Sequence, residues 1–178
     1  MTRINPWLAT APFLLGSIAP IEAVCEIYMS DQQAAATLFP AKKMLKKNLV
    51  LSEEDVEAVE KASGETVRLK ELTYFKSPAG ELVFIDQALG KHEFITYAIG
   101  VDKSGKVKGI EILEYKESYG HEVRRPAWRE QFVGKDLKSP LKVDEDIKSI
   151  SGATLSSVHI THGVKRVLHT QTILGKRL

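Results

Sequence analysis

Hydrophobic and polar positions alternate along the middle of the chain, between residues 66 and 117. The runs ELTYFKS, ELVFIDQAL, EFITYAIGV and KVKGIEILEY are rich in β-branched and aromatic residues, a composition typical of strands. Turn residues separate these runs, as in Pro78-Ala79-Gly80 and DKSG. The links are too short for crossover connections, so we expect about four antiparallel strands in a meander. In the third run, alternation places four residues on one face: Ile95, Tyr97, Ile99 and Val101.

Helical signals flank this region on its N-terminal side. Ser30 with Gln33 three residues later is a capping-box pattern, and Pro40 stops the predicted helix. A second capped helix is predicted from Ser52 to about Gly64. Between the two lie four lysines, for which we predict a solvated helix face, with contact to anionic lipid headgroups as the alternative: Lys42, Lys43, Lys46 and Lys47.

A C-terminal helix is predicted after Ser151. Its apolar stripe predicts a core-facing side made of Ile160, Val164, Val167 and Leu168. The remaining face carries polar residues, namely His159, His162, Lys165, Arg166 and His169. Histidines at this spacing can bind metal, but no third ligand is evident, so we predict solvated histidines and no metal site. The pattern as a whole predicts an α+β fold, with a twisted antiparallel sheet flanked by N-terminal and C-terminal helices.

Composition narrows the class of protein. The 178 residues suit one domain, and 43% hydrophobic with 27% charged residues is ordinary globular usage. A net charge of +2 does not favour nucleic acid as a partner. The single cysteine excludes zinc ribbons, c-type haem and cysteine-ligated iron–sulfur clusters.

The N-terminus has the pattern of an export signal. Arg3 is followed by no charged residue from Ile4 to Ile21, and small residues, Ala23 and Cys25, precede Glu26. We therefore predict a signal over residues 1–25 and a periplasmic or otherwise extracytoplasmic protein, with membrane association left open. The alternatives are a buried N-terminal helix and an uncleaved anchor.

The stretch SGATLSS, residues 151–157, holds the most distinctive chemistry. It lies at a predicted helix start, where unpaired backbone N–H groups and the helix dipole favour an anion. Gly152 permits close approach of the backbone to a ligand, and the hydroxyls supply donors, so a phosphate group fits best. The alternative is an ordinary helix cap in which Ser151 or Thr154 satisfies one backbone N–H group.

SGATLSS resembles the flavinylation signature of the FMN-binding domain family, whose members include components of the sodium-translocating NADH:quinone oxidoreductase and of the Rnf electron-transfer complex. WREQFVGKDL, residues 128–137, is similar to the family's Trp-x-x-Gln-Phe-x-Gly-Lys stretch, and KESYG is similar to its flavin-approaching Glu-Thr-Pro-Gly segment. The resemblance implies FMN joined through its phosphate to Thr154 by a transferase that uses FAD as donor. One departure is Lys148, where the family usually carries Asp.

The motif and the resemblance together give a set of predicted cofactor-binding residues: Thr154, Ser151, Gly152, Ala153, Leu155, Ser156, Ser157 and Glu117. For Glu117 the alternative is the polar end of a strand. Leu155 and Val158 lie off the core stripe, where they either pad the flavin ring or form a shifted hydrophobic edge. Tyr119 and Trp128 either stack near the ring or pack in the core. Hydrolase and kinase motifs are absent from the sequence, and we assign no catalytic residue.

These patterns predict a three-part organisation: an export signal over 1–25, a helical N-terminal segment over 26–65 and an FMN-binding domain over 66–178. The predicted function is that of an exported flavoprotein with covalent FMN, which relays electrons between redox partner proteins rather than acting as a stand-alone enzyme. The alternative is a non-catalytic exported binding or assembly module that holds a phosphate-bearing ligand non-covalently.

Overall fold

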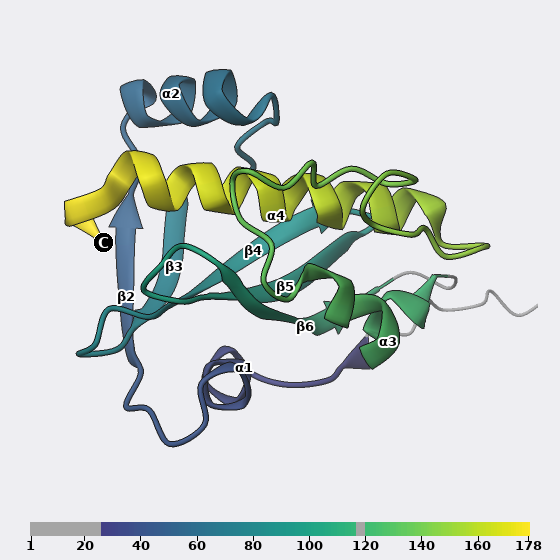
Figure 1. Ribbon diagram of the computed structural model, residues 1–178, viewed down its shortest axis with the longest axis horizontal. Coiled ribbons are helices and arrows are strands. Elements are labelled where there is room, and N and C mark those ends of the chain that lie inside the picture. The colour runs from purple at the N-terminus through teal and green to yellow at the C-terminus, as the bar shows by residue number, and fades with distance from the viewer. Residues whose placement is uncertain (1–25, 117–119) are drawn as a thin grey trace, which may run out of the picture.

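A computed structural model describes residues 26–116 and 120–178. Within them, six strands form one antiparallel sheet in the order β1-β6-β5-β4-β3-β2 (Figure 1). The strands are β1 Glu26–Ile27, β2 Leu45–Val50, β3 Glu71–Lys76, β4 Leu82–Leu89, β5 Phe94–Val101 and β6 Val107–Tyr115. The four strands predicted from the alternating pattern are β3 to β6, and their antiparallel meander is confirmed.

Helices precede and follow the meander, as predicted. The α-helices are α1 Asp31–Leu38, α2 Glu53–Ser63, α3 Pro126–Arg129 and α4 Thr154–Leu174, and short 3-10 turns are η1 His121–Arg124, η2 Glu130–Phe132 and η3 Gly175–Arg177. The capping box predicted at Ser30 is present before α1, and the cap predicted at Ser52 before α2 is also a capping box. In each box the serine hydroxyl accepts a hydrogen bond from the backbone N–H three residues later. That N–H group lies in the first turn and has no acceptor within the helix.

The sheet separates two hydrophobic clusters. On the face covered by α4, the four alternating residues of β5 and the predicted stripe of α4 are all buried, which confirms both predictions. On the opposite face, α1 packs its small and apolar residues against the sheet. Ala34, Ala35 and Leu38 meet Phe75, Val83, Ala98 and Leu113 there. The α+β class is therefore confirmed.

The basic run between α1 and α2 does not form a helix face, so that prediction was wrong. Lys46 and Lys47 belong to β2, which pairs along its whole length with β3. Pairing with an existing strand outweighs local helix preference in so short a run. Two of the lysines form ion pairs, Lys42 with Glu81 and Lys46 with Asp31, each at 3.0 Å. The segment 26–65 thus contributes strands β1 and β2 to the sheet as well as two helices.

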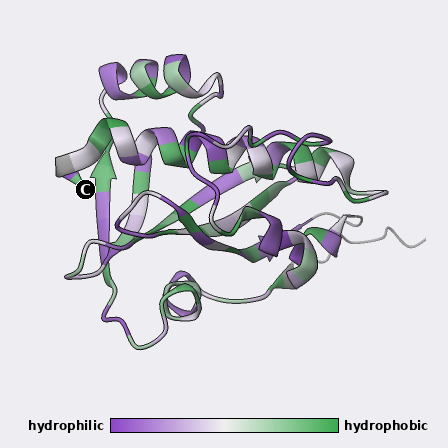
Figure 2. Cartoon of the chain, viewed as in Figure 1, coloured by the Kyte–Doolittle hydropathy of each residue, from purple (hydrophilic) through white to green (hydrophobic). Residues whose placement is uncertain are grey.

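Arg166 was predicted on the polar face of α4, and in the structure it is buried. Helix α2 packs against α4 from the side away from the sheet (Figure 1), so α4 is covered on two sides. Along α4, hydrophilic residues are interspersed with hydrophobic ones (Figure 2). The Arg166 guanidinium is buried and lies 2.6 Å from Asp86 Oδ2, which also accepts a hydrogen bond from the Tyr97 hydroxyl at 2.9 Å. The ion pair and the hydrogen bonds offset the free-energy cost of burying this charge.

The three histidines of α4 are half-buried rather than fully solvated. His159 Nδ1 contacts the carbonyl oxygen of Leu89, and His162 Nδ1 lies 3.1 Å from Glu65 Oε2. Burial, together with nearby Lys165, lowers the pKa of His169. Among the described residues, no group of His, Cys, Asp and Glu is arranged to hold a metal ion.

The predicted export signal, residues 1–25, lies outside the described residues. Over residues 26–116 and 120–178, no helix combines the length and the apolar character that a bilayer span requires.

Candidate functional site

The motif of residues 151–157 forms a tight turn and the first turn of α4. The Ala153 N–H donates to the Ile150 carbonyl at 2.9 Å, and Gly152 supplies a positive φ of 84° within that turn. Ala153 is the residue at the helix cap, and no side chain accepts a hydrogen bond from the first turn there. The ordinary helix-cap interpretation is therefore wrong for both Ser151 and Thr154.

The motif has two sides that differ in burial. The outer side consists of Ser151, Gly152, Thr154 and Leu155, all exposed. The inner side consists of Ala153, Ser156 and Ser157, all buried, with Ser157 fully inaccessible. Seven of the eight residues assigned to the cofactor from the sequence therefore lie together, but they divide between an accessible surface and the packed interior.

Ser157 ties the turn to the helix. Its hydroxyl donates to the Ala153 carbonyl at 3.0 Å and accepts a hydrogen bond from the Ile150 N–H at 3.3 Å. One buried side chain thereby satisfies backbone groups on both sides of the exposed residues Ser151 and Gly152. The role of Ser157 in the described structure is to fix the shape of the motif.

Ser156 and Ala153 pack against the end of the segment that follows β6. An added Cβ at Gly120 would lie 2.5 Å from the Tyr115 hydroxyl oxygen and 3.3 Å from both Ala153 Cβ and Ser156 Oγ. The Tyr115 and Ser156 hydroxyl oxygens are 3.4 Å apart. The structure thus brings the end of KESYG directly against SGATLSS, although the two are more than thirty positions apart in the printed sequence. Glu117, predicted among the cofactor-binding residues, and Tyr119, for which stacking near the ring and core packing were both left open, lie outside the described residues.

The outer side offers the chemistry that a phosphate group needs. Among the described residues, the Thr154 hydroxyl forms no hydrogen bond, and it is exposed at the start of a 21-residue helix. The first backbone N–H groups of a helix lack intrahelical partners and point towards an anion placed there. A Cβ at Gly152 would meet no atom within 4 Å, so the approach is open. These residues fit a phosphate group such as that of FMN.

Apolar surface lies beside Thr154. Leu155 is 50% exposed, and Val158, one turn further, is half-buried. This exposure suits both predicted roles, padding a flavin ring and forming a hydrophobic edge.

Trp128 packs in the core, which decides between its two predicted roles. It is 4% exposed and meets Phe132 edge to face, with ring centroids 5.1 Å apart. Its indole N–H donates to the Lys148 carbonyl at 2.8 Å, and the Gln131 side-chain oxygen accepts from the Lys148 N–H, also at 2.8 Å. The side chain of Lys148 itself is exposed. From the sequence, Trp128 was a candidate for contact with the ring and Gln131 was given no role. Both residues match the Trp-x-x-Gln pattern of the WREQFVGKDL stretch, and that match was the available signal for Gln131.

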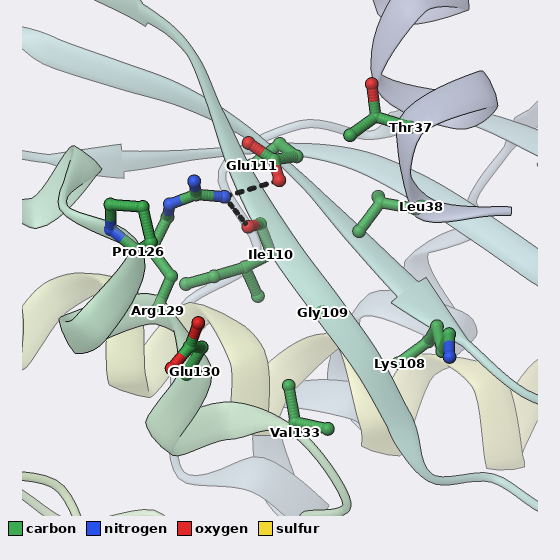
Figure 3. A pocket seen from close by; sticks show the side chains of 10 residues that line it. All are labelled: Thr37, Leu38, Lys108, Gly109, Ile110, Glu111, Pro126, Arg129, Glu130 and Val133. Carbon is green, nitrogen blue, oxygen red and sulfur yellow. Dashed lines mark hydrogen bonds and ion pairs between the residues drawn. The ribbon is translucent and has the colours of Figure 1, made fainter. Parts of the chain in front are cut away.

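Cavities lie elsewhere in the described part of the chain. One of about 240 Å³ lies between α1, β6 and the α3–η2 segment (Figure 3), one of about 470 Å³ lies beside the start of α1, and one of about 410 Å³ lies near the C-terminal end of α4. No residue of the motif lines any of these three. The candidate site is therefore defined by its exposed residues Ser151, Gly152, Thr154 and Leu155.

Comparison with known proteins agrees with this geometry. Residues 90–169 match the model of the FMN-binding domain, a span that contains the whole motif and the WREQFVGKDL stretch. This match supports an FMN-binding domain over residues 90–169, with FMN as its cofactor. The match does not single out the two respiratory-complex components of that family. The search of curated proteins found no match.

Proposed function

We propose that this chain is an exported flavoprotein in which FMN is attached covalently to Thr154, and that it relays electrons between redox partner proteins. The observation that carries the proposal is the contrast at the motif. The Thr154 hydroxyl is exposed and has no hydrogen bond among the described residues, while its neighbours Ser156 and Ser157 are buried.

The attachment step balances with FAD as the donor. The Thr154 oxygen attacks the phosphorus of the FMN half of FAD and loses its proton. The bond from that phosphorus to the bridging oxygen of the pyrophosphate breaks, and AMP leaves with the bridging oxygen. The product is a phosphoester, so no oxidant or reductant is consumed. A flavin transferase would supply the acid–base chemistry, and this chain supplies the acceptor hydroxyl.

The proposed relay follows from the chemistry of the group and from its exposure. A bound flavin accepts and returns one or two electrons, while the protein contributes its tether, orientation and surroundings. A covalent tether has a particular use outside the cytoplasm, because dissociated FMN would be lost by dilution there. Attachment at the exposed first turn of α4 would leave the flavin accessible to another protein. We therefore propose redox proteins, membrane-bound ones included, as its partners.

The mass of the secreted protein tests this proposal. The full chain is coexpressed with a flavin transferase in a host that exports it, recovered from the periplasm and measured intact under denaturing conditions. We expect a chain beginning near Glu26 and heavier by one FMN less one water. A protein that keeps Met1 and stays in the cytoplasm would contradict export.

The flavin readout separates the proposal from the alternative binding module. Protein that is yellow when native but loses all flavin on denaturation would contradict covalent attachment and favour a non-covalent module. Protein that carries covalent flavin but exchanges no electrons with reduced membranes would contradict the relay.

A further inference from the structure

We propose that Trp128, Gln131 and Lys135 are positioning residues, which hold the loop before the motif so that Thr154 is presented to the flavin transferase. This inference rests on the proposed attachment of FMN to Thr154. It concerns the recognition of this chain as a substrate, and it assigns to these three side chains a role separate from contact with the flavin.

The first contact fixes both peptide groups that flank Lys148. The Trp128 indole N–H donates to its carbonyl oxygen, and the Gln131 side-chain oxygen accepts from its N–H, each at 2.8 Å. The Gln131 amide is itself oriented, because its nitrogen donates to the Trp128 carbonyl at 3.2 Å. The chain direction at Lys148, three residues before the motif, is therefore set by two side chains of another segment.

The second contact holds the same loop two residues earlier. Lys135 Nζ lies 2.8 Å from Asp146 Oδ2, and the other oxygen of that carboxylate accepts from the Lys142 N–H at 2.9 Å. Burial alone would raise the pKa of Asp146, but Lys135 and the backbone N–H groups of Lys142 and Leu141 hold that pKa below its ordinary value. Asp146 is thus a charged anchor for the loop at neutral pH.

These contacts leave little freedom between the loop and the helix. Lys148 is held from one side, and the Ile150 N–H is held by Ser157 from the other. Only Ser149 lies between them, and only Ser151 and Gly152 lie between Ile150 and the cap residue Ala153. A loop ordered before the enzyme binds loses less conformational entropy in the complex, so preorganisation speeds a reaction that needs one geometry.

The same segment offers a matched control. Arg129 is directed towards β6 (Figure 3), where its guanidinium donates to the Ile110 carbonyl at 2.6 Å and pairs with Glu111. Arg129 is about as buried as Lys135, and it also contributes an ion pair to the fold. Its removal should therefore destabilise the protein without freeing the loop.

The experiment compares attachment rates on the full chain, purified without flavin and incubated with a flavin transferase and FAD. The variants are Trp128→Phe, which keeps an aromatic ring but removes the N–H, Lys135→Met and the control Arg129→Met. We expect kcat/KM of the transferase to fall about tenfold to a hundredfold for the first two, as for other misplaced reacting groups, and to stay unchanged for the control. Lys135→Arg keeps the cation and should restore the rate.

Stability is measured on the same samples by urea unfolding, so that rates are compared only for folded protein. Equal rates for parent, Trp128→Phe and Lys135→Met would overturn the positioning role while leaving attachment at Thr154 intact. An equal fall in the Arg129→Met control would also overturn it, because loss of stability alone would then explain the effect. A parent that never accepts flavin would instead overturn the proposed function on which this inference rests.

Discussion

The two sides of the SGATLSS motif differ more than their sequence suggests. Serine and threonine occur on both sides, yet Ser156 and Ser157 are buried while Ser151 and Thr154 are exposed. The helical period explains the division. Positions 153, 156, 157 and 160 recur on one side of α4 and face the core, and positions 154, 155 and 158 lie on another.

This division indicates that a hydroxyl-rich motif can combine a structural function with a chemical one. The inner hydroxyls build the turn, and the outer hydroxyl is left for chemistry. The two functions should therefore separate on mutation: inner substitutions should lower the free energy of unfolding, while outer ones should leave it unchanged. The predictions below run from the largest expected change in that free energy to the smallest.

Gly120 should be the most sensitive position near the motif. It has a positive φ of 93°, and a Cβ there would lie 2.5 Å from the buried Tyr115 hydroxyl oxygen. Gly120→Ala should lower the free energy of unfolding by about 2–4 kcal/mol, from backbone strain and overpacking together. Urea unfolding measures the change, and a loss of less than about 0.5 kcal/mol, as at an ordinary surface site, would contradict the close packing of the two segments.

Ser157 comes next. Ser157→Ala leaves the Ile150 N–H without its partner, and an unsatisfied buried donor costs about 1–3 kcal/mol. The matched comparison is Ser151→Ala on the outer side, which should change the free energy of unfolding by less than about 0.5 kcal/mol. Equal losses for the two variants would show that the inner and outer sides do not differ energetically.

Lys148 should matter least to the fold. Its side chain is exposed, and only its backbone is held by Trp128 and Gln131. Lys148→Asp, which introduces the residue usual in the family, should leave the free energy of unfolding within about 0.5 kcal/mol of the parent. We also expect a larger flavinylated fraction when the transferase is limiting. A smaller fraction, measured by in-gel fluorescence, would indicate that Lys148 takes part in the site.

Local patterns were sufficient for most of the fold. Alternation predicted β3 to β6, and cap patterns at Ser30 and Ser52 predicted both early helices. The apolar stripe of α4 identified its core face. Each of these signals lies within a few residues of the structure it specifies. Strand β2 was missed because its pairing with β3 is a tertiary contact. Arg166 was misplaced because its partners, Asp86 and the carbonyl oxygens of Gln87 and Thr66, are tertiary contacts that the helical period does not show.

The sequence predicted which residues belong to the candidate site. It did not predict their burial or their hydrogen bonds. The sequence placed residues 151–157 in one motif and, through the resemblance, singled out Thr154. It did not indicate which residues of the motif are buried, since burial depends on what packs against the helix. The link from Lys148 to Trp128 and Gln131 spans seventeen residues or more and joins side chains to backbone atoms. No periodic pattern encodes such a contact.

The central claim is that Thr154 is the attachment point and is otherwise dispensable. Thr154→Ala removes an exposed hydroxyl with no hydrogen bond among the described residues, so the free energy of unfolding should change by less than about 0.5 kcal/mol. Thr154→Ser keeps a nucleophilic oxygen and should retain some attachment. The outer neighbour Ser151→Ala should weaken attachment without abolishing it.

The most direct measurement is flavin fluorescence in a denaturing gel, with parent, Thr154→Ala and Thr154→Ser each exported and coexpressed with the transferase. We predict a fluorescent parent, a weaker but fluorescent Thr154→Ser and no fluorescence at all for folded Thr154→Ala. A Thr154→Ala protein that fluoresces as strongly as the parent would contradict the claim, because the covalent bond would then lie at another residue.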